Sequence, residues 1–61
     1  MFIEVSYLGS GEKVYINPDQ IILITKYGTE GTEIMTVKDF ITVKESYSVV
    51  KERIESAYLR V

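Results

Sequence analysis

Residues 40–54 read FITVKESYSVVKERI, and the hydrophobic pattern changes its period within this stretch. Residues 40–44 are typical of a β-strand. From Ser46 onward the apolar side chains recur with the period of an α-helix, and serine is a favoured residue at a helix N-terminus. The sequence therefore predicts a strand followed by a helix over about residues 46–59. The apolar stripe of this helix consists of Tyr47, Val50, Ile54, Ala57, Tyr58 and Val61.

The chain before this stretch reads as a series of strands separated by turns. Gly9-Ser10-Gly11 predicts a hairpin turn, and residues 17–20, which contain Pro18, predict a turn or a short 3₁₀ segment. Residues 21–27 are apolar at four successive positions, which is typical of a central strand covered on both faces. We therefore expect one α+β domain over residues 1–61, an antiparallel β-meander of four to five strands with one C-terminal helix packed on one face. The strands are predicted over about residues 2–8, 12–16, 21–27, 32–37 and 40–44.

The composition limits how such a small domain can be stabilised. The chain has 61 residues, of which 46% are hydrophobic, and it contains neither Cys nor His. A domain of this size buries only about 60% of the surface that its unfolded chain exposes. Without Cys and His there is no disulfide and no plausible ligand set for zinc, haem or an iron–sulfur cluster. We therefore expect no metal or cofactor, and stabilisation by tight packing or by formation of a homo-oligomer.

Several functional classes are disfavoured by the same composition. Without His and Cys, catalysis would depend on carboxylates, Lys or hydroxyl groups, and the acidic pairs Glu30/Glu33 and Glu52/Glu55 read as solvated surface, so we expect no enzyme and no catalytic residues. The net charge of −2 disfavours nucleic acid as a partner. The longest apolar run has four residues, which is too short to span a membrane, and the first residues do not resemble a secretory signal. A cytoplasmic location is expected.

The sequence holds more apolar side chains than one helix can cover. This surplus comprises Phe2, Leu8, Ile21 or Ile22, Leu23, Met35 and Phe40. Such side chains, together with five tyrosines, are typical of a contact surface, although a monomer with a few exposed apolar groups is the alternative. We predict non-catalytic binding to another copy or to a host or cellular protein. The predicted contact residues are Phe2, Tyr15, Ile22, Leu23 and Tyr27.

Three segments of the chain resemble the FlbD-type family of flagellar and swarming-motility proteins. The segments are residues 11–21 (GEKVYINPDQI), residues 32–36 (TEIMT) and residues 43–46 (VKES). The resemblance implies a short protein that runs from strands through an Asn-Pro turn and a hairpin into a C-terminal helix, and it brings no catalytic residues. The same pattern also looks like small proteins of phages and mobile elements, which bind and block or sequester host components.

A second binding class remains open on the sequence alone. In this alternative an oligomeric phage-type inhibitor or sponge sequesters an anionic small molecule, such as a nucleotide signal, in a pocket between subunits. Tyrosine side chains and either Lys26 or Lys44 would line that pocket.

Overall fold

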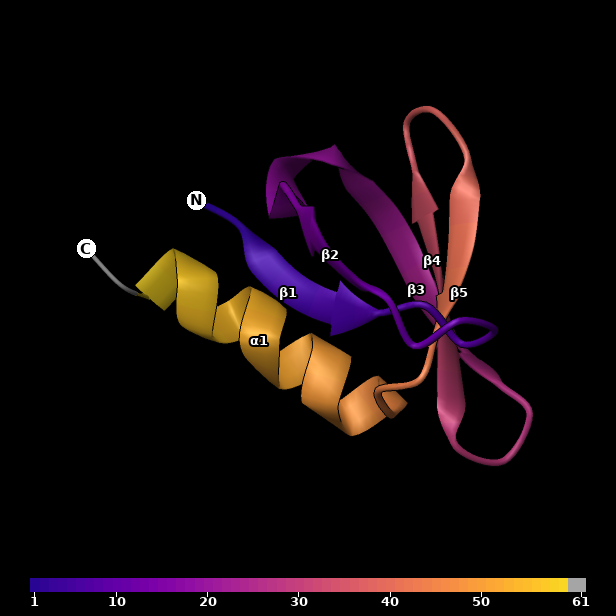
Figure 1. Ribbon diagram of the computed structural model, residues 1–61. Coiled ribbons are helices and arrows are strands. Elements are labelled where there is room, and N and C mark those ends of the chain that lie inside the picture. Colours follow the sequence, from indigo (N-terminus) through magenta and orange to yellow (C-terminus); the bar gives the residue numbers. More distant parts are fainter. Residues whose placement is uncertain (60–61) are drawn as a thin grey trace.

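The computed structural model describes residues 1–59, which form strands, a short 3₁₀ helix and a C-terminal α-helix (Figure 1). The α+β fold class predicted from the sequence is confirmed. Val61, the last predicted member of the helical stripe, lies outside the described residues. The elements are β1 (Ile3–Ser6), β2 (Lys13–Ile16), η1 (Pro18–Gln20), β3 (Ile21–Tyr27), β4 (Gly31–Thr36), β5 (Phe40–Val43) and α1 (Tyr47–Leu59).

The strands are antiparallel, as predicted, but they are divided between two sheets. One sheet pairs β1 with β2, and the other has the order β3-β4-β5. An isolated bridge between Tyr7 and Val43 joins the sheets, and the Leu8 N–H extends it by donating to the Thr42 carbonyl oxygen at 2.9 Å. The 3₁₀ turn at Pro18 lies between β2 and β3, at the point where the chain passes from the first sheet to the second.

The hydrophobic core lies between the two sheets and α1. In the first sheet Ile3 lies opposite Ile16, and in the second sheet Ile34 lies between Ile24 and Ile41. The side of the second sheet that carries Ile34 is therefore its inner face. Helix α1 contacts β1, β3 and β4 from this side, and Figure 1 shows it running alongside β1. The buried apolar residues are Ile3, Val5, Ile16, Ile34, Val43 and Val50.

Local side-chain chemistry sets the turns and the start of the helix. The Asn17 side chain accepts a hydrogen bond from the Asp19 N–H at 2.9 Å, which caps η1 as predicted for this segment. Gly11 has a φ of +77°, a conformation that glycine adopts without strain, and it leads into β2 as expected for a hairpin turn. The Ser46 hydroxyl accepts from the Val49 N–H at 3.3 Å, which confirms Ser46 as the N-cap of α1.

The prediction that residues 21–27 form a central, doubly covered strand is wrong for the described part of the chain. Strand β3 lies at one end of its sheet and pairs only with β4 there. Ile22 and Leu23 are 59% and 45% exposed. The sequence of such an exposed apolar strand resembles that of a buried strand, because the apolar pattern does not distinguish burial within the chain from contact with another molecule.

Candidate interaction surface

Three apolar side chains form a continuous row across the outer face of the second sheet. Leu23 lies directly opposite Met35, and Met35 lies directly opposite Phe40. These residues alternate with Ile24, Ile34 and Ile41 of the inner face, so their side chains point away from the core. Leu23, Met35 and Phe40 are 45%, 39% and 62% exposed. We call these three residues the outer apolar row.

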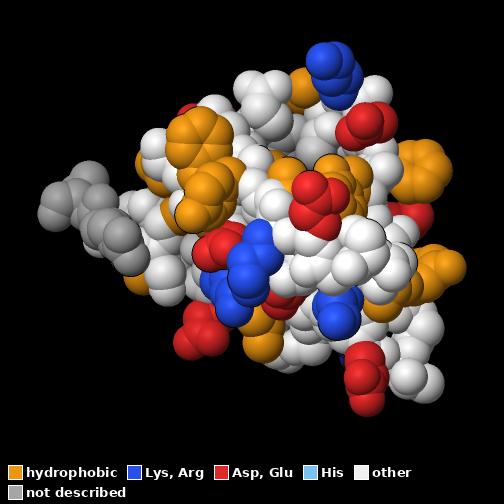
Figure 2. Space-filling model, viewed as in Figure 1, with side chains coloured by type: hydrophobic (Ala, Val, Ile, Leu, Met, Phe, Trp, Pro, Cys, Tyr) orange, Lys and Arg blue, Asp and Glu red, His pale blue; other side chains and the backbone are white. Residues whose placement is uncertain are grey.

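Further exposed apolar side chains lie beside the outer apolar row. Ile22 lies where the register between β3 and β4 is shifted, and Val37 directly follows β4. Val37 is held in place because its N–H donates to the Gln20 carbonyl oxygen at 3.0 Å. Leu8 adjoins β5 through its hydrogen bond to Thr42 and is also exposed. Figure 2 shows hydrophobic side chains at the margin of the molecule beside β5.

The row ends at the free edge of β3. This strand is seven residues long and carries one charged residue, Lys26. Edge strands are commonly protected from pairing by short length, several charges or proline. Strand β3 is not short and contains no proline, and it has only one charge where several would protect it. A register shift between Ile21 and Leu23 is a further protection at one end of the strand.

The predicted contact residues are all exposed, but the structure places them on two different sheets. Ile22, Leu23 and Tyr27 belong to β3. Tyr15 belongs to β2, where it lies opposite Glu4 and is 69% exposed, and Phe2 directly precedes β1.

The predicted contact residues do not include Met35, the direct neighbour of Leu23, or Phe40, which lies opposite Met35. The sequence marks both residues only as surplus apolar side chains. Because Met35 and Phe40 alternate with Ile34 and Ile41, the sequence could have placed them on the outer face. The pairing that joins them into a row, however, depends on strand register.

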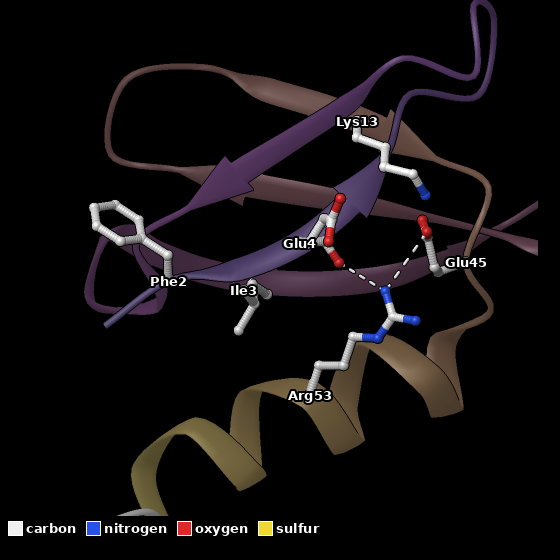
Figure 3. A pocket seen from close by; sticks show the side chains of 6 residues that line it. All are labelled: Phe2, Ile3, Glu4, Lys13, Glu45 and Arg53. Carbon is white, nitrogen blue, oxygen red and sulfur yellow. Dashed lines mark hydrogen bonds and ion pairs between the residues drawn. The ribbon is translucent and has the colours of Figure 1, made fainter.

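A separate pocket of about 290 Å³ lies between the first sheet and α1 (Figure 3). Its charged lining consists of Glu4, Lys13, Glu45 and Arg53, and Phe2 points away from these charged groups. Two acidic and two basic groups neutralise one another here, so the pocket has no strong preference for an anion or a cation. The pocket therefore offers little support for a ligand site.

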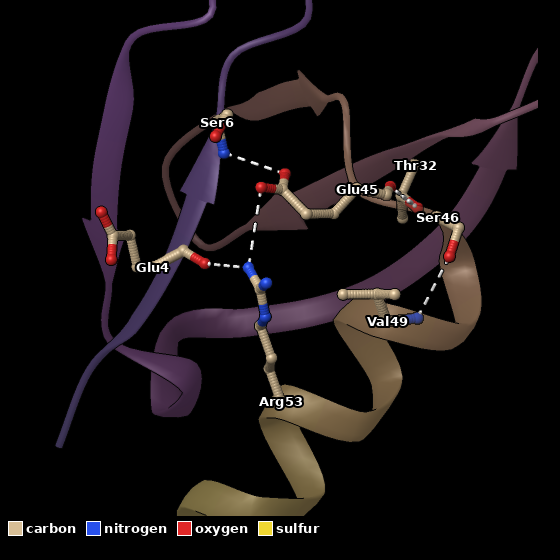
Figure 4. A network of polar contacts seen from close by, with 7 residues as sticks. All are labelled: Glu4, Ser6, Thr32, Glu45, Ser46, Val49 and Arg53. Carbon is tan, nitrogen blue, oxygen red and sulfur yellow. Dashed lines mark hydrogen bonds and ion pairs between the residues drawn. The ribbon is translucent and has the colours of Figure 1, made fainter.

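Two charged side chains of this pocket, Glu45 and Arg53, belong to a polar network that joins α1 to both sheets (Figure 4). The Ser6 N–H donates to Oε1 of Glu45 at 2.9 Å, and Nη1 of Arg53 lies 3.6 Å from Oε2 of the same carboxylate. Arg53 also donates to the Glu4 carbonyl oxygen at 2.6 Å. The Thr32 hydroxyl donates to the Glu45 carbonyl oxygen at 2.8 Å. Glu45 thus links β1, β4 and α1.

The environment of Glu45 favours its charged form. Burial pushes the pKa of this carboxyl upward, but the hydrogen bond from the Ser6 N–H and the positive charge of Arg53 outweigh burial, so its pKa lies below the ordinary value. The Glu45 side chain is 16% exposed. These contacts hold α1 against the sheets. They indicate a structural role for Glu45 and do not indicate an acid–base site.

The lysines proposed for an anionic ligand lie in different surroundings. Lys26 lines a hollow of about 120 Å³ beside the start of α1, and Glu30 lines the same hollow. The Nζ of Lys44 instead lies over Gly11, 3.7 Å from the position that a Cβ on this glycine would occupy. The proposed pocket between subunits stays a prediction, because a single copy of the chain does not test it.

Residues 1–59 contain neither a cluster of metal ligands nor a membrane-spanning helix. These residues contain no group of three or more acidic side chains placed to hold a metal ion. In the same part of the chain, no helix combines the length and the apolar character needed to cross a membrane.

No protein-family model, curated protein or solved structure matches this chain.

Proposed function

We propose that this protein is a non-catalytic binding protein that acts through protein–protein contacts at the outer apolar row and its flanks. The observation that carries the proposal is the direct pairing of Leu23, Met35 and Phe40 on a face that α1 does not cover. With Ile22 and Val37, these side chains present roughly 500 Å² of apolar surface, which is the size of the largest apolar patch on a typical monomer, and such patches are often functional. The proposed contact is therefore larger than scattered exposed apolar groups would offer.

The kind of partner follows from the same surface. An apolar row with few charges suits another protein surface of similar character, either a second copy or a cellular or host protein. The resemblance to FlbD-type proteins and to small phage proteins supports a regulatory binding role of this kind, and we place this role in the cytoplasm. Tyr27 adds an aromatic ring at the β3 end of the surface, where it is 48% exposed.

Photo-cross-linking in the cells that produce the protein tests this proposal. A benzophenone amino acid replaces Phe40 on the outer apolar row or, as the control, Ser56 on the exposed side of α1. We expect discrete protein adducts from position 40 and none from position 56. The proposal is wrong if position 40 forms no adduct, or if both positions give the same adducts.

A further inference from the structure

We infer that the free edge of β3 pairs antiparallel with β3 of a second copy, centred on Thr25, so that two three-stranded sheets become one six-stranded sheet. This inference rests on the proposed binding function. It identifies a second copy of the chain as the partner that binds at the free edge of β3. It is carried by three features of β3: an open backbone edge, a register limit at one end and a self-complementary order of side chains.

The open edge supplies backbone groups that pair with another strand. In the described chain β4 occupies one side of β3, so the N–H and C=O groups that point to the other side have no strand partner there. The side chains from Leu23 to Tyr27 are exposed except for Ile24, which is half-buried. A strand from a second molecule can therefore approach this edge.

The register shift near Ile22 limits which part of β3 can form a regular ladder. Regular pairing with β4 begins at Leu23 and continues to Tyr27. The midpoint of this regular segment is Thr25. A twofold axis at Thr25 therefore uses the whole regular segment of both copies, whereas an axis at Ile24 would extend the pairing into the irregular part of both strands.

The order of side chains fits this register. With Thr25 opposite its own copy, Leu23 lies opposite Tyr27 of the second copy on the outer face, and this aliphatic–aromatic pair occurs twice. On the inner face Lys26 lies opposite Ile24 of the second copy, so its apolar stem covers that side chain. An axis at Lys26 would instead place two lysines opposite each other, which is unfavourable.

The predicted pairing also extends the apolar surface. The outer apolar row of one copy would continue through Leu23 onto Tyr27 of the second copy. Pairing of residues 23–27 would bury the open edge of β3 together with Leu23 and Tyr27 of both copies, whereas Met35 and Phe40 lie on strands farther from that edge. A contact of five residues on each strand is smaller than the roughly 1,000 Å² expected of a stable and specific protein–protein interface. We therefore expect a dimer that dissociates on dilution.

A disulfide trapping experiment tests the partner and the register together. The chain contains no cysteine, so Thr25→Cys introduces a single thiol. At the centre of an antiparallel pair, the two Cα atoms would lie about 4.5–5.5 Å apart, which is within disulfide range. The control is Thr29→Cys, because Thr29 is also exposed but its two copies would lie more than about 20 Å apart.

We expect mild oxidation of concentrated protein to link Thr25→Cys into dimers at least about tenfold faster than Thr29→Cys at the same concentration, because pairing raises the effective thiol concentration. Circular dichroism establishes that both variants are folded. Equal rates for the two variants would overturn the inference. If the rates are equal but the cross-linker at position 40 captures a different protein, then the β3 pairing is wrong and the proposed function stands. If position 40 also captures nothing, both fail.

Discussion

Removal of the Glu45 side chain tests how much the contacts of this residue, which hold α1 against the sheets, stabilise the fold. The Ser6 N–H donates to this carboxylate at 2.9 Å, and the side chain is 16% exposed. A hydrogen bond to a charged acceptor contributes about 1.5–3 kcal/mol. The ion pair with Arg53 adds little, about 0.5 kcal/mol or less, because Arg53 is 45% exposed and its Nη1 lies 3.6 Å away. Glu45→Ala should therefore lower the free energy of unfolding by about 2 kcal/mol.

Urea denaturation followed by circular dichroism measures this change. For a domain of this size a loss of about 2 kcal/mol corresponds to a fall in melting temperature of roughly 10 °C. The matched control is Glu52→Ala, because Glu52 lies on the exposed side of α1, and its effect should stay within about 0.5 kcal/mol. If the two variants unfold at the same urea concentration, the network in Figure 4 does not stabilise the fold as argued.

The same carboxylate predicts a dependence of stability on pH. The pKa of Glu45 is lower in the folded protein than its ordinary value, so at acidic pH the unfolded chain binds the proton more readily. The stabilisation from Glu45 is complete above the ordinary glutamate pKa of about 4.3 and is lost as the pH falls through the lower folded value. The destabilisation caused by Glu45→Ala should therefore shrink as the pH is lowered below about 4. A difference that stays constant down to pH 2 would contradict this assignment.

Other variants probe the helix cap, a close backbone approach and a tyrosine. Ser46→Ala should lower the unfolding free energy by about 1 kcal/mol in urea titrations, since it removes the N-cap of α1. Gly31→Ala should cost roughly 1–3 kcal/mol, because its Cβ would lie 2.9 Å from a carbonyl oxygen of β5, whereas Gly9→Ala has open space and serves as the control. A hydrogen bond to Asp19 raises the pKa of Tyr58, so Asp19→Asn should lower that pKa in an NMR titration.

The sequence predicts most of the local structure because local structure depends on neighbouring residues. The period-two alternation places Ile3 and Val5 in the core, and Ser46 caps the helix as expected. The division of the strands into two sheets could not be predicted from neighbouring residues. The way in which the two sheets meet depends on the contact of Tyr7 with Val43, which lie far apart in the chain, and no local pattern specifies such a pair.

The candidate surface was only partly predictable for the same reason. Apolar excess in the sequence marks Ile22 and Leu23 among the side chains that one helix cannot cover, and both are exposed in the structure, although their role as contacts remains a prediction. The row formed by Leu23, Met35 and Phe40 appears only once register is known, because a shift of one residue would move each side chain to the opposite face. The Glu45 network was missed because a glutamate just before a helix reads as solvated surface, and its partner Ser6 is 39 residues away.

The mass of the protein in solution tests most directly whether the exposed apolar side chains of the second sheet form an interface between two copies of the chain. Sedimentation velocity is measured on the unmodified protein and on a Leu23→Lys, Met35→Lys variant across a range of concentrations. Because both residues are exposed, the variant should remain folded. The account predicts about 14 kDa at high concentration for the unmodified protein, twice the chain mass of 7.0 kDa, and 7.0 kDa for the variant. Equal masses at every concentration would contradict it.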